Sequence, residues 1–239
     1  MQDKKETTPI VQRHDPLAQP MHESNRKQVL FALQLQRLAA IVGILLFGII
    51  YLFLPRRLTY VPNWLPLLIE VVLVLPFIYS LIARRHLPHK LTRMLGFLVA
   101  GIATLALLGS IVLLVITLPA RDTAQAGSLL LDAALLWLSN ILVFGLWFWE
   151  IDGGGPFKRH LMGHKAADFL FPQQATNTIT ERWAPHFMDY VFVAFTNATA
   201  FSPTDTPPLS RTAKLLMMIE AIISLLIVAL LAARAINIL

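Results

Sequence analysis

Uninterrupted apolar runs, separated by short polar connectors, dominate the chain from residue 38 onward. A helix that crosses a hydrocarbon core about 30 Å thick needs roughly 20 predominantly apolar residues. Runs near or above that length lie at 38–54, 64–83, 94–118, 129–149 and 215–231. The pattern therefore predicts an all-α fold, a polytopic membrane helix bundle with five full spans.

A sixth apolar stretch, residues 190–204, is uncharged but only 15 residues long and is rich in Thr, Asn, Ser and Ala. As a helix it reaches about 22 Å, which is short for a crossing. We expect either a short crossing helix or a re-entrant segment ahead of the last span. Four transmembrane helices are then expected within 24–149, and this segment with the final helix within 186–239.

Residues 150–185 form a long polar loop between the fourth run and the sixth stretch. The loop opens with Asp152-Gly-Gly-Gly-Pro156, a strong chain break followed by a proline that favours the first position of a helix. We expect an interfacial helix over residues 157–171. The side chains expected to face lipid are Phe157, Leu161, Phe169 and Phe171.

The basic residues between the runs set the expected orientation. Fourteen Lys and Arg lie in the N-terminal tail, the second loop and the 150–185 loop, against three in the opposite loops. Cytoplasmic loops carry such an excess, so the N-terminus is expected in the cytoplasm. The C-terminus joins it only if 190–204 crosses. Residues 1–23, polar and rich in proline, predict a disordered cytoplasmic tail and not a cleavable signal.

Composition narrows the class of protein further. The 239 residues are 56% hydrophobic and 14% charged, and the mean hydropathy is +0.63, far outside globular usage. The net charge of +6 comes from residues between apolar runs, which excludes nucleic acid as a partner and leaves the lipid bilayer. The chain has no Cys, which excludes thiol catalysis and Cys-ligated metals.

Polar side chains at membrane depth are costly and are therefore the default functional candidates. They are Glu70, Asn140, Glu220 and Ser224, with Asp132 near the start of a span. Glu220 and Ser224 share one helical face, which suits either close helix packing or a wet path. For each carboxyl the alternative is a helix-end group that reaches water, or a protonated group bonded to a neighbouring helix.

His160, His164 and Asp168 follow one another at i, i+4 and i+8, so a single helix would place all three on one face. They are weak candidates for metal ligands. The alternative is a pair of histidines at the level of the lipid headgroups. No nucleophile-elbow, zinc-protease or phosphate-loop motif occurs in the sequence. We therefore predict neither an enzyme nor a cofactor.

The stretch from Tyr190 to Asp205 is the most specific in the chain. Along the sequence, a short amphipathic helix is followed by a run of small hydroxyl residues, an acidic residue that ends the run, and then a long apolar helix. Over 129–239 this order resembles the pore helix, filter and inner helix of the tetrameric potassium-channel superfamily. Continued through Ser210-Arg211 and Ala235-Ile-Asn237, it resembles a family of bacterial inner-membrane proteins of unknown function. The resemblance implies a homo-oligomer in a bacterial inner membrane.

The filter motif departs from the potassium type. With Asp205 at the closing acid, Ser202 and Thr204 take the two glycine positions, and Pro203 takes the tyrosine position. Alternate filter residues adopt backbone angles that side chains resist, so potassium-type carbonyl cages are not expected. The remaining interpretation of this stretch is a wider pore for small cations. Its candidate lining residues are Thr196, Asn197, Thr199, Ser202, Thr204 and Asp205.

The leading functional hypothesis is a channel-like or transport-related protein for small cations. The rival hypothesis is a non-conducting membrane scaffold or accessory protein. In the rival, the Thr196–Thr199 run packs helices closely and Asp205 caps the last helix.

Overall fold

The computed structural model of the protein describes residues 38, 40–82, 89–117, 126–163, 165–175, 183–200 and 205–236. Gln36–Leu239 form one compact unit, and Met1–Leu35 form another that lies wholly outside the described residues. The predicted tail over 1–23 therefore stays a prediction.

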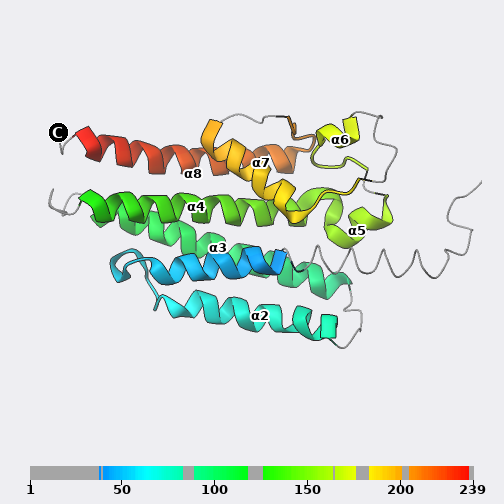
Figure 1. Ribbon diagram of the computed structural model, residues 1–239, viewed down its shortest axis with the longest axis horizontal. Helices are drawn as coiled ribbons and strands as arrows, with labels where there is room; N and C mark the ends of the chain where they lie inside the picture. The colour runs from blue at the N-terminus through cyan, green and yellow to red at the C-terminus, as the bar shows by residue number, and fades with distance from the viewer. Residues whose placement is uncertain are drawn as a thin grey trace, which may run out of the picture. The chain divides into compact units, whose positions relative to one another are not determined.

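Helices make up the regular structure of the described residues (Figure 1). Within them the one β feature is an isolated bridge between Phe169 and Pro208. The prediction of an all-α fold is confirmed. In chain order the helices are Ala40–Phe53, η1 (Arg56–Leu58), α2 (Trp64–Ile82), α3 (His89–Thr117), α4 (Ala126–Ile151), η4 (Asp152–Gly154), α5 (Pro156–Leu161), α6 (Pro172–Ala175), α7 (Phe187–Ala200) and α8 (Arg211–Ile236).

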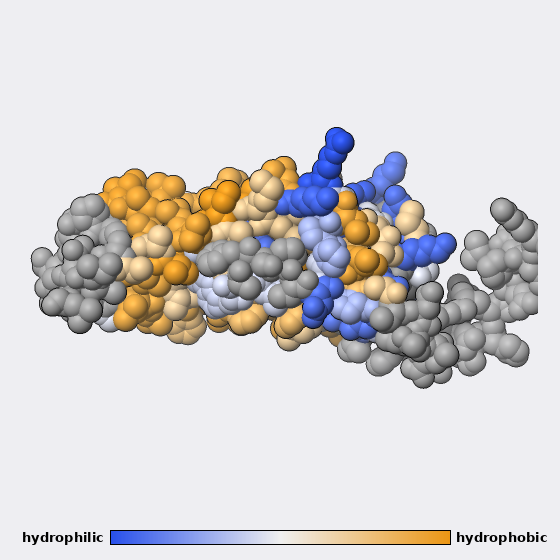
Figure 2. All heavy atoms as spheres, turned by 90° about the horizontal axis from the view of Figure 1, so that it is seen from above, coloured by the Kyte–Doolittle hydropathy of each residue, from blue (hydrophilic) through white to orange (hydrophobic). Residues whose placement is uncertain are grey.

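Three of these helices are long and apolar enough to cross a membrane, with spans at Lys90–Thr117, Gly127–Gly154 and Arg211–Ala232. Ala40–Phe53 and Trp64–Pro76 are apolar but shorter. Hydrophobic residues cover much of the described surface, and hydrophilic residues gather toward the end where α5 lies (Figure 2). These features are those of a membrane protein.

Helix α4 is the centre of the bundle. It packs on α3 along one side and on α7 and α8 along another (Figure 1). Within the unit, 67% of its span is buried, against 39% for the α3 span and 28% for the α8 span. Gly145 makes the α7 contact possible, because a Cβ there would lie 3.1 Å from the Val191 backbone. Most of α4 therefore faces protein, whereas α8 leaves most of its surface uncovered by this chain.

The start of α7 and the segment that follows α7 both lie at the C-terminal end of α4. At the start of α7, the Phe187 ring lies edge-on to Trp149, at the end of α4, with ring centroids 5.9 Å apart. After α7, the Leu209 N–H donates to the Asp168 carbonyl at 2.8 Å. The Asp168 N–H in turn donates to the Asp152 carboxylate, next to the last turn of α4. The chain after α7 therefore returns to the end of α4 at which α7 begins.

The two ends of the bundle can now be named. The α5 end holds α5, the last turn of α4 and the first turns of α7 and α8. The η1 end holds η1 and the first turns of α4, where Arg57 pairs with Asp132 at 3.1 Å. Helix α8 starts at the α5 end, where the Ser210 hydroxyl accepts the Ala213 N–H at 3.1 Å. Ser210, and not Asp205, is thus the residue that caps the last helix.

The prediction of an interfacial helix over 157–171 is wrong. Helix α5 ends at Leu161, and Gly163 follows with φ 67°, a left-handed conformation that stops the helix. Phe169 and Phe171 are 0% and 3% exposed, and both pack on the Tyr190 ring instead of facing lipid. Aromatic contacts within the protein, and not the amphipathic pattern of the loop, therefore determine where Phe169 and Phe171 lie. The side chains of Phe157 and Leu161 lie outside the described residues.

Single cysteines in the Cys-free chain test the return after α7. Gln173→Cys and Leu209→Cys, both exposed at the α5 end, are expected to react with a membrane-impermeant maleimide from the same side of the membrane. Val61→Cys, at the η1 end, is expected to react from the other side. The measurement compares right-side-out with inverted vesicles. Labelling of Gln173→Cys and Leu209→Cys from opposite sides would make α7 a crossing helix.

Candidate functional site

Four buried polar side chains from three helices meet at the centre of the α4, α7 and α8 contact. The Asn140 amide of α4 donates to the Ser224 hydroxyl at 2.9 Å and to the Glu220 carbonyl at 3.2 Å. The Asn197 amide of α7 donates to the Glu220 carboxyl at 2.8 Å and to the Met217 carbonyl at 2.8 Å. We refer to Asn140, Asn197, Glu220 and Ser224 as the Glu220 cluster.

Two oxygens of the Glu220 cluster have no hydrogen-bond partner among the described residues. They are Oε1 of Glu220 and Oδ1 of Asn140, and both residues are 0% exposed. The amide nitrogens of Asn140 and Asn197 each make two hydrogen bonds, so all four N–H donors of the two side chains are used. Apart from the Ser224 hydroxyl proton, the cluster therefore has no donor left for these two acceptors. A proton or a small cation would supply what the two oxygens lack.

The spacing of residues along α8 explains why the cluster is buried. Glu220, Ser224 and Ile227 recur at helical spacing, and all three are 0% exposed. Ile222 and Leu225, on the opposite face, are 63% and 54% exposed. One polar strip of α8 thus faces α4 and α7, while the rest of the helix presents apolar side chains outward.

The candidate pore residues on α7 point in different directions. The Thr196 hydroxyl donates to the Val193 carbonyl at 2.9 Å, and that of exposed Thr199 donates to the Phe195 carbonyl at 2.8 Å. Only Asn197 reaches the Glu220 cluster. Because α7 stays helical through Ala200, these residues occupy a helix and not an extended, filter-like segment. Asp205 is exposed, and Ser202 and Thr204 lie outside the described residues.

A second buried cluster lies at the α5 end and was not predicted from the sequence. The Arg159 guanidinium, 2% exposed, donates to the Trp149 and Asp152 carbonyls at 3.1 and 2.7 Å. It lies 3.7 Å from the Asp152 carboxylate and stacks over the Trp149 and Tyr190 rings at 4.7 and 5.0 Å. We refer to Trp149, Asp152, Arg159 and Tyr190 as the Arg159 cluster.

Asp152 joins the elements of the α5 end to one another. Its carboxylate accepts the Tyr190 hydroxyl of α7 and the N–H groups of Asp168 and Phe169. Its ion pair with Arg159 balances the buried charge. The Arg159 cluster therefore fixes the start of α7 against the last turn of α4.

The glycines after Asp152 are the signal that points to this cluster. Gly153, Gly154 and Gly155 have φ values of 60°, 79° and 97°, which residues with a side chain rarely adopt. Three such residues in succession turn the chain sharply, so that α5 packs Arg159 back over Trp149. A run of glycines directly after a span that ends in aromatic residues thus indicates a sharp turn of the chain. It does not reveal which basic residue the turn buries.

Asp132 and Glu70 have different surroundings. Asp132 is buried near the start of α4 and pairs with Arg57, which is partly exposed at the η1 end, so it contacts a cation and does not itself reach the surface. Glu70, on α2, is 2% exposed, and its Oε2 has no partner among the described residues. Of these two carboxyls, only Glu70 is buried without a cation beside it.

The candidate metal ligands do not share a helical face. His160 belongs to α5, which ends at Leu161, and burial lowers the pKa of its imidazole. Asp168 lies beyond that helix and accepts the Gly153 N–H at 2.9 Å. His164 lies outside the described residues. The part of the chain that the structure describes holds no group of three or more His, Cys, Asp or Glu suited to a metal ion.

Comparison with known proteins adds no relative: no family model, curated protein or solved structure matches the chain. The functional proposal therefore rests on the geometry of the chain's own residues.

Replacing the buried guanidinium is expected to destabilise the bundle. Arg159→Ala leaves the Asp152 carboxylate buried without its cation, which costs about 3 to 5 kcal/mol of unfolding free energy. Lys158→Ala, at the exposed neighbouring position, is expected to cost less than about 0.5 kcal/mol. Unfolding in mixed detergent micelles measures both. Equal effects would mean that the ion pair contributes nothing.

The Asn197 amide is expected to matter more than the neighbouring hydroxyl. Asn197→Ala leaves the buried Glu220 carboxyl without its donor and removes a second donor from the Met217 carbonyl, which costs about 1 to 3 kcal/mol. Thr199→Ala removes an exposed hydroxyl bonded to its own helix, so its expected cost is within about 0.5 kcal/mol. The same unfolding assay compares them. A larger loss for Thr199→Ala would contradict the assigned contacts.

Proposed function

We propose that the chain is a multi-pass protein of a bacterial inner membrane that moves small cations, with the Glu220 cluster as the cation-binding site. The observation that carries the proposal is a fully buried carboxyl that accepts the Asn197 amide and has one oxygen without a partner among the described residues. The Asn140 amide holds the backbone carbonyl of the same residue. Buried carboxyls in membrane helices are costly and mark ion or proton sites by default. Transport by this site needs no potassium-type filter.

The same proposal includes the number of spans. Ala40–Phe53 and α2 complete five spans with the three long helices, and α7 is the sixth, re-entrant segment. With this topology Arg211 and Lys214 lie on the same side as the N-terminus, and sixteen of the 20 Lys and Arg lie there. The positive-inside tendency then puts the N-terminus and the α5 end in the cytoplasm and the C-terminus outside.

The proposed partners are the lipid bilayer and further copies of the chain. Within one chain only 28% of the α8 span is buried, and its exposed face is apolar. Either lipid or a second copy can cover such a face. A symmetric homo-oligomer would bring α8 and the adjacent α7 of each copy toward one axis.

A non-conducting scaffold is the second candidate, and one observation favours it. All four N–H donors of Asn140 and Asn197 bond across helix contacts, so the Glu220 cluster also fastens α4 and α7 to α8. In that role the basic residues at the α5 end would contact anionic lipid or another protein.

Ion flux in liposomes separates the two candidates. Glu220→Gln keeps the shape of the side chain but removes its charge. Hydrogen bonds to charged groups are worth about 1.5 to 3 kcal/mol, so the expected loss of cation flux is about tenfold or more. The matched controls are Thr199→Val and Asp205→Ala, which change exposed side chains and are expected to keep their flux.

Each other outcome has a defined meaning. If Thr199→Val and Asp205→Ala lose flux while Glu220→Gln keeps it, the ion path follows the segment after α7 and the proposed site is wrong. If the unmodified protein conducts no cation under any gradient, the scaffold is the better description.

A further inference from the structure

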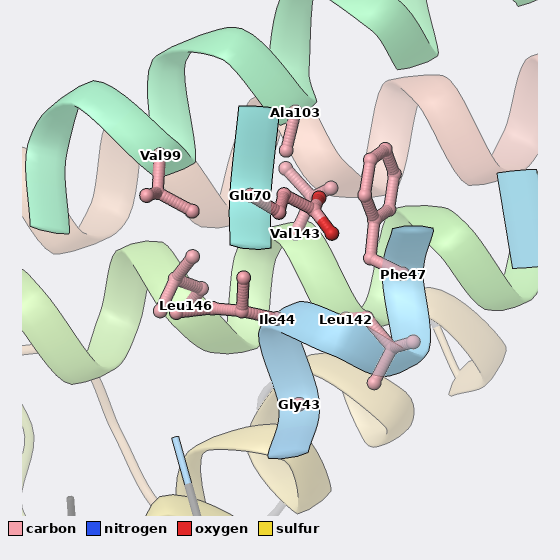
Figure 3. Close-up of a pocket in the computed structure, with 9 residues that line it drawn as sticks. All are labelled: Gly43, Ile44, Phe47, Glu70, Val99, Ala103, Leu142, Val143 and Leu146. Carbon is pink, nitrogen blue, oxygen red and sulfur yellow. The ribbon is translucent and has the colours of Figure 1, made fainter. Parts of the chain in front are cut away.

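Glu70 projects into a small cavity enclosed by four helices. Residues of the first helix, α3 and α4 line it together with Glu70 of α2, as Figure 3 shows. Its volume of about 10 Å³ is close to the smallest space that holds one water molecule. The cavity is thus a water-sized space with a single carboxyl group in its wall.

The other lining side chains are apolar. Ile44 and Phe47 come from the first helix, Val99 and Ala103 from α3, and Val143 and Leu146 from α4. No charged or titratable side chain besides Glu70 is among the lining residues, and its own neighbours one turn away on α2, Pro66 and Val74, are apolar. An ionised carboxylate here has no nearby cation among the described residues to balance it, which is energetically costly.

Gly48 keeps space clear for the carboxyl group. A Cβ at this position would overlap Oε2 of Glu70 and would lie 3.1 Å from the Leu67 backbone. Oε2 itself has no hydrogen-bond partner among the described residues. A leucine in place of Glu70 would avoid this cost, so packing alone does not explain a carboxyl at this position.

We infer that Glu70 and this cavity form a proton-binding site, in which the carboxyl group takes up and releases a proton. A metal ion does not fit, because hard cations need about six oxygen ligands and the lining supplies only the Glu70 carboxyl. A proton, in contrast, neutralises the carboxylate without any further ligand, which the apolar lining does not supply.

This site is separate from the Glu220 cluster and does not depend on its proposed role. Both contact α4 within about two turns, since Asn140 belongs to the Glu220 cluster while Val143 and Leu146 line the Glu70 cavity. The central helix therefore has a buried, uncompensated carboxyl beside each of two faces. Loss of cation flux and loss of proton binding at Glu70 are distinct measurements.

Infrared difference spectroscopy of the full chain in liposomes tests the inference. The spectrum of the unmodified protein minus that of Glu70→Gln is expected to contain the carbonyl stretch of a carboxylic acid. This band is expected to weaken reversibly as the pH rises from about 5 to about 9 and to shift in heavy water. Glu220→Gln, the matched control, is expected to keep the Glu70 band.

Two results would overturn the inference. Absence of the band at every pH would mean that Glu70 stays ionised, and a band that responds to neither pH nor heavy water would mean a permanently neutral packing group. Glu70→Asp covers the case in which Glu70→Gln does not fold. It keeps a carboxyl group, so the band is expected at a shifted frequency and with the same response to pH.

Discussion

A hydrocarbon environment offers no hydrogen bonds, so every polar group that a membrane helix carries must find its partner inside the protein. Helix α4 supplies many of these partners to α5 and α8. Its Asn140 holds Glu220 and Ser224 of α8, while the carbonyls of Trp149 and Asp152 at and just beyond its end hold Arg159. The most buried helix is thus also the one through which the polar side chains of its neighbours are satisfied.

The sequence predicted the helices well and their contacts poorly. Long apolar runs suffice to place α3, α4 and α8, because the thickness of the hydrocarbon core sets their length. The spacing of Glu220 and Ser224 also revealed their common face. In contrast, the burial of Arg159 depends on three successive left-handed glycines, and no local pattern shows which side chain such a turn encloses.

Segment 187–200 shows why the candidate site was only partly predictable. Its hydroxyl and amide residues are adjacent in sequence, which suggested one lining. A helix separates neighbours by about 100°, so Asn197 faces Glu220 whereas Thr196 and Thr199 bond to their own backbone. The return of the chain after α7 depends on contacts such as that between Phe169 and Pro208, which join residues far apart in sequence.

The short length of α7 makes the bundle unequal along its axis. Fourteen residues reach about 21 Å, so α7 covers α4 and α8 from the α5 end and stops at Ala200, before either neighbour ends. Toward the η1 end α7 itself does not cover the seam between α4 and α8. In the proposed topology acyl chains of a single leaflet lie beside this part of the two helices, so the lipid composition of that leaflet would affect how tightly they pack.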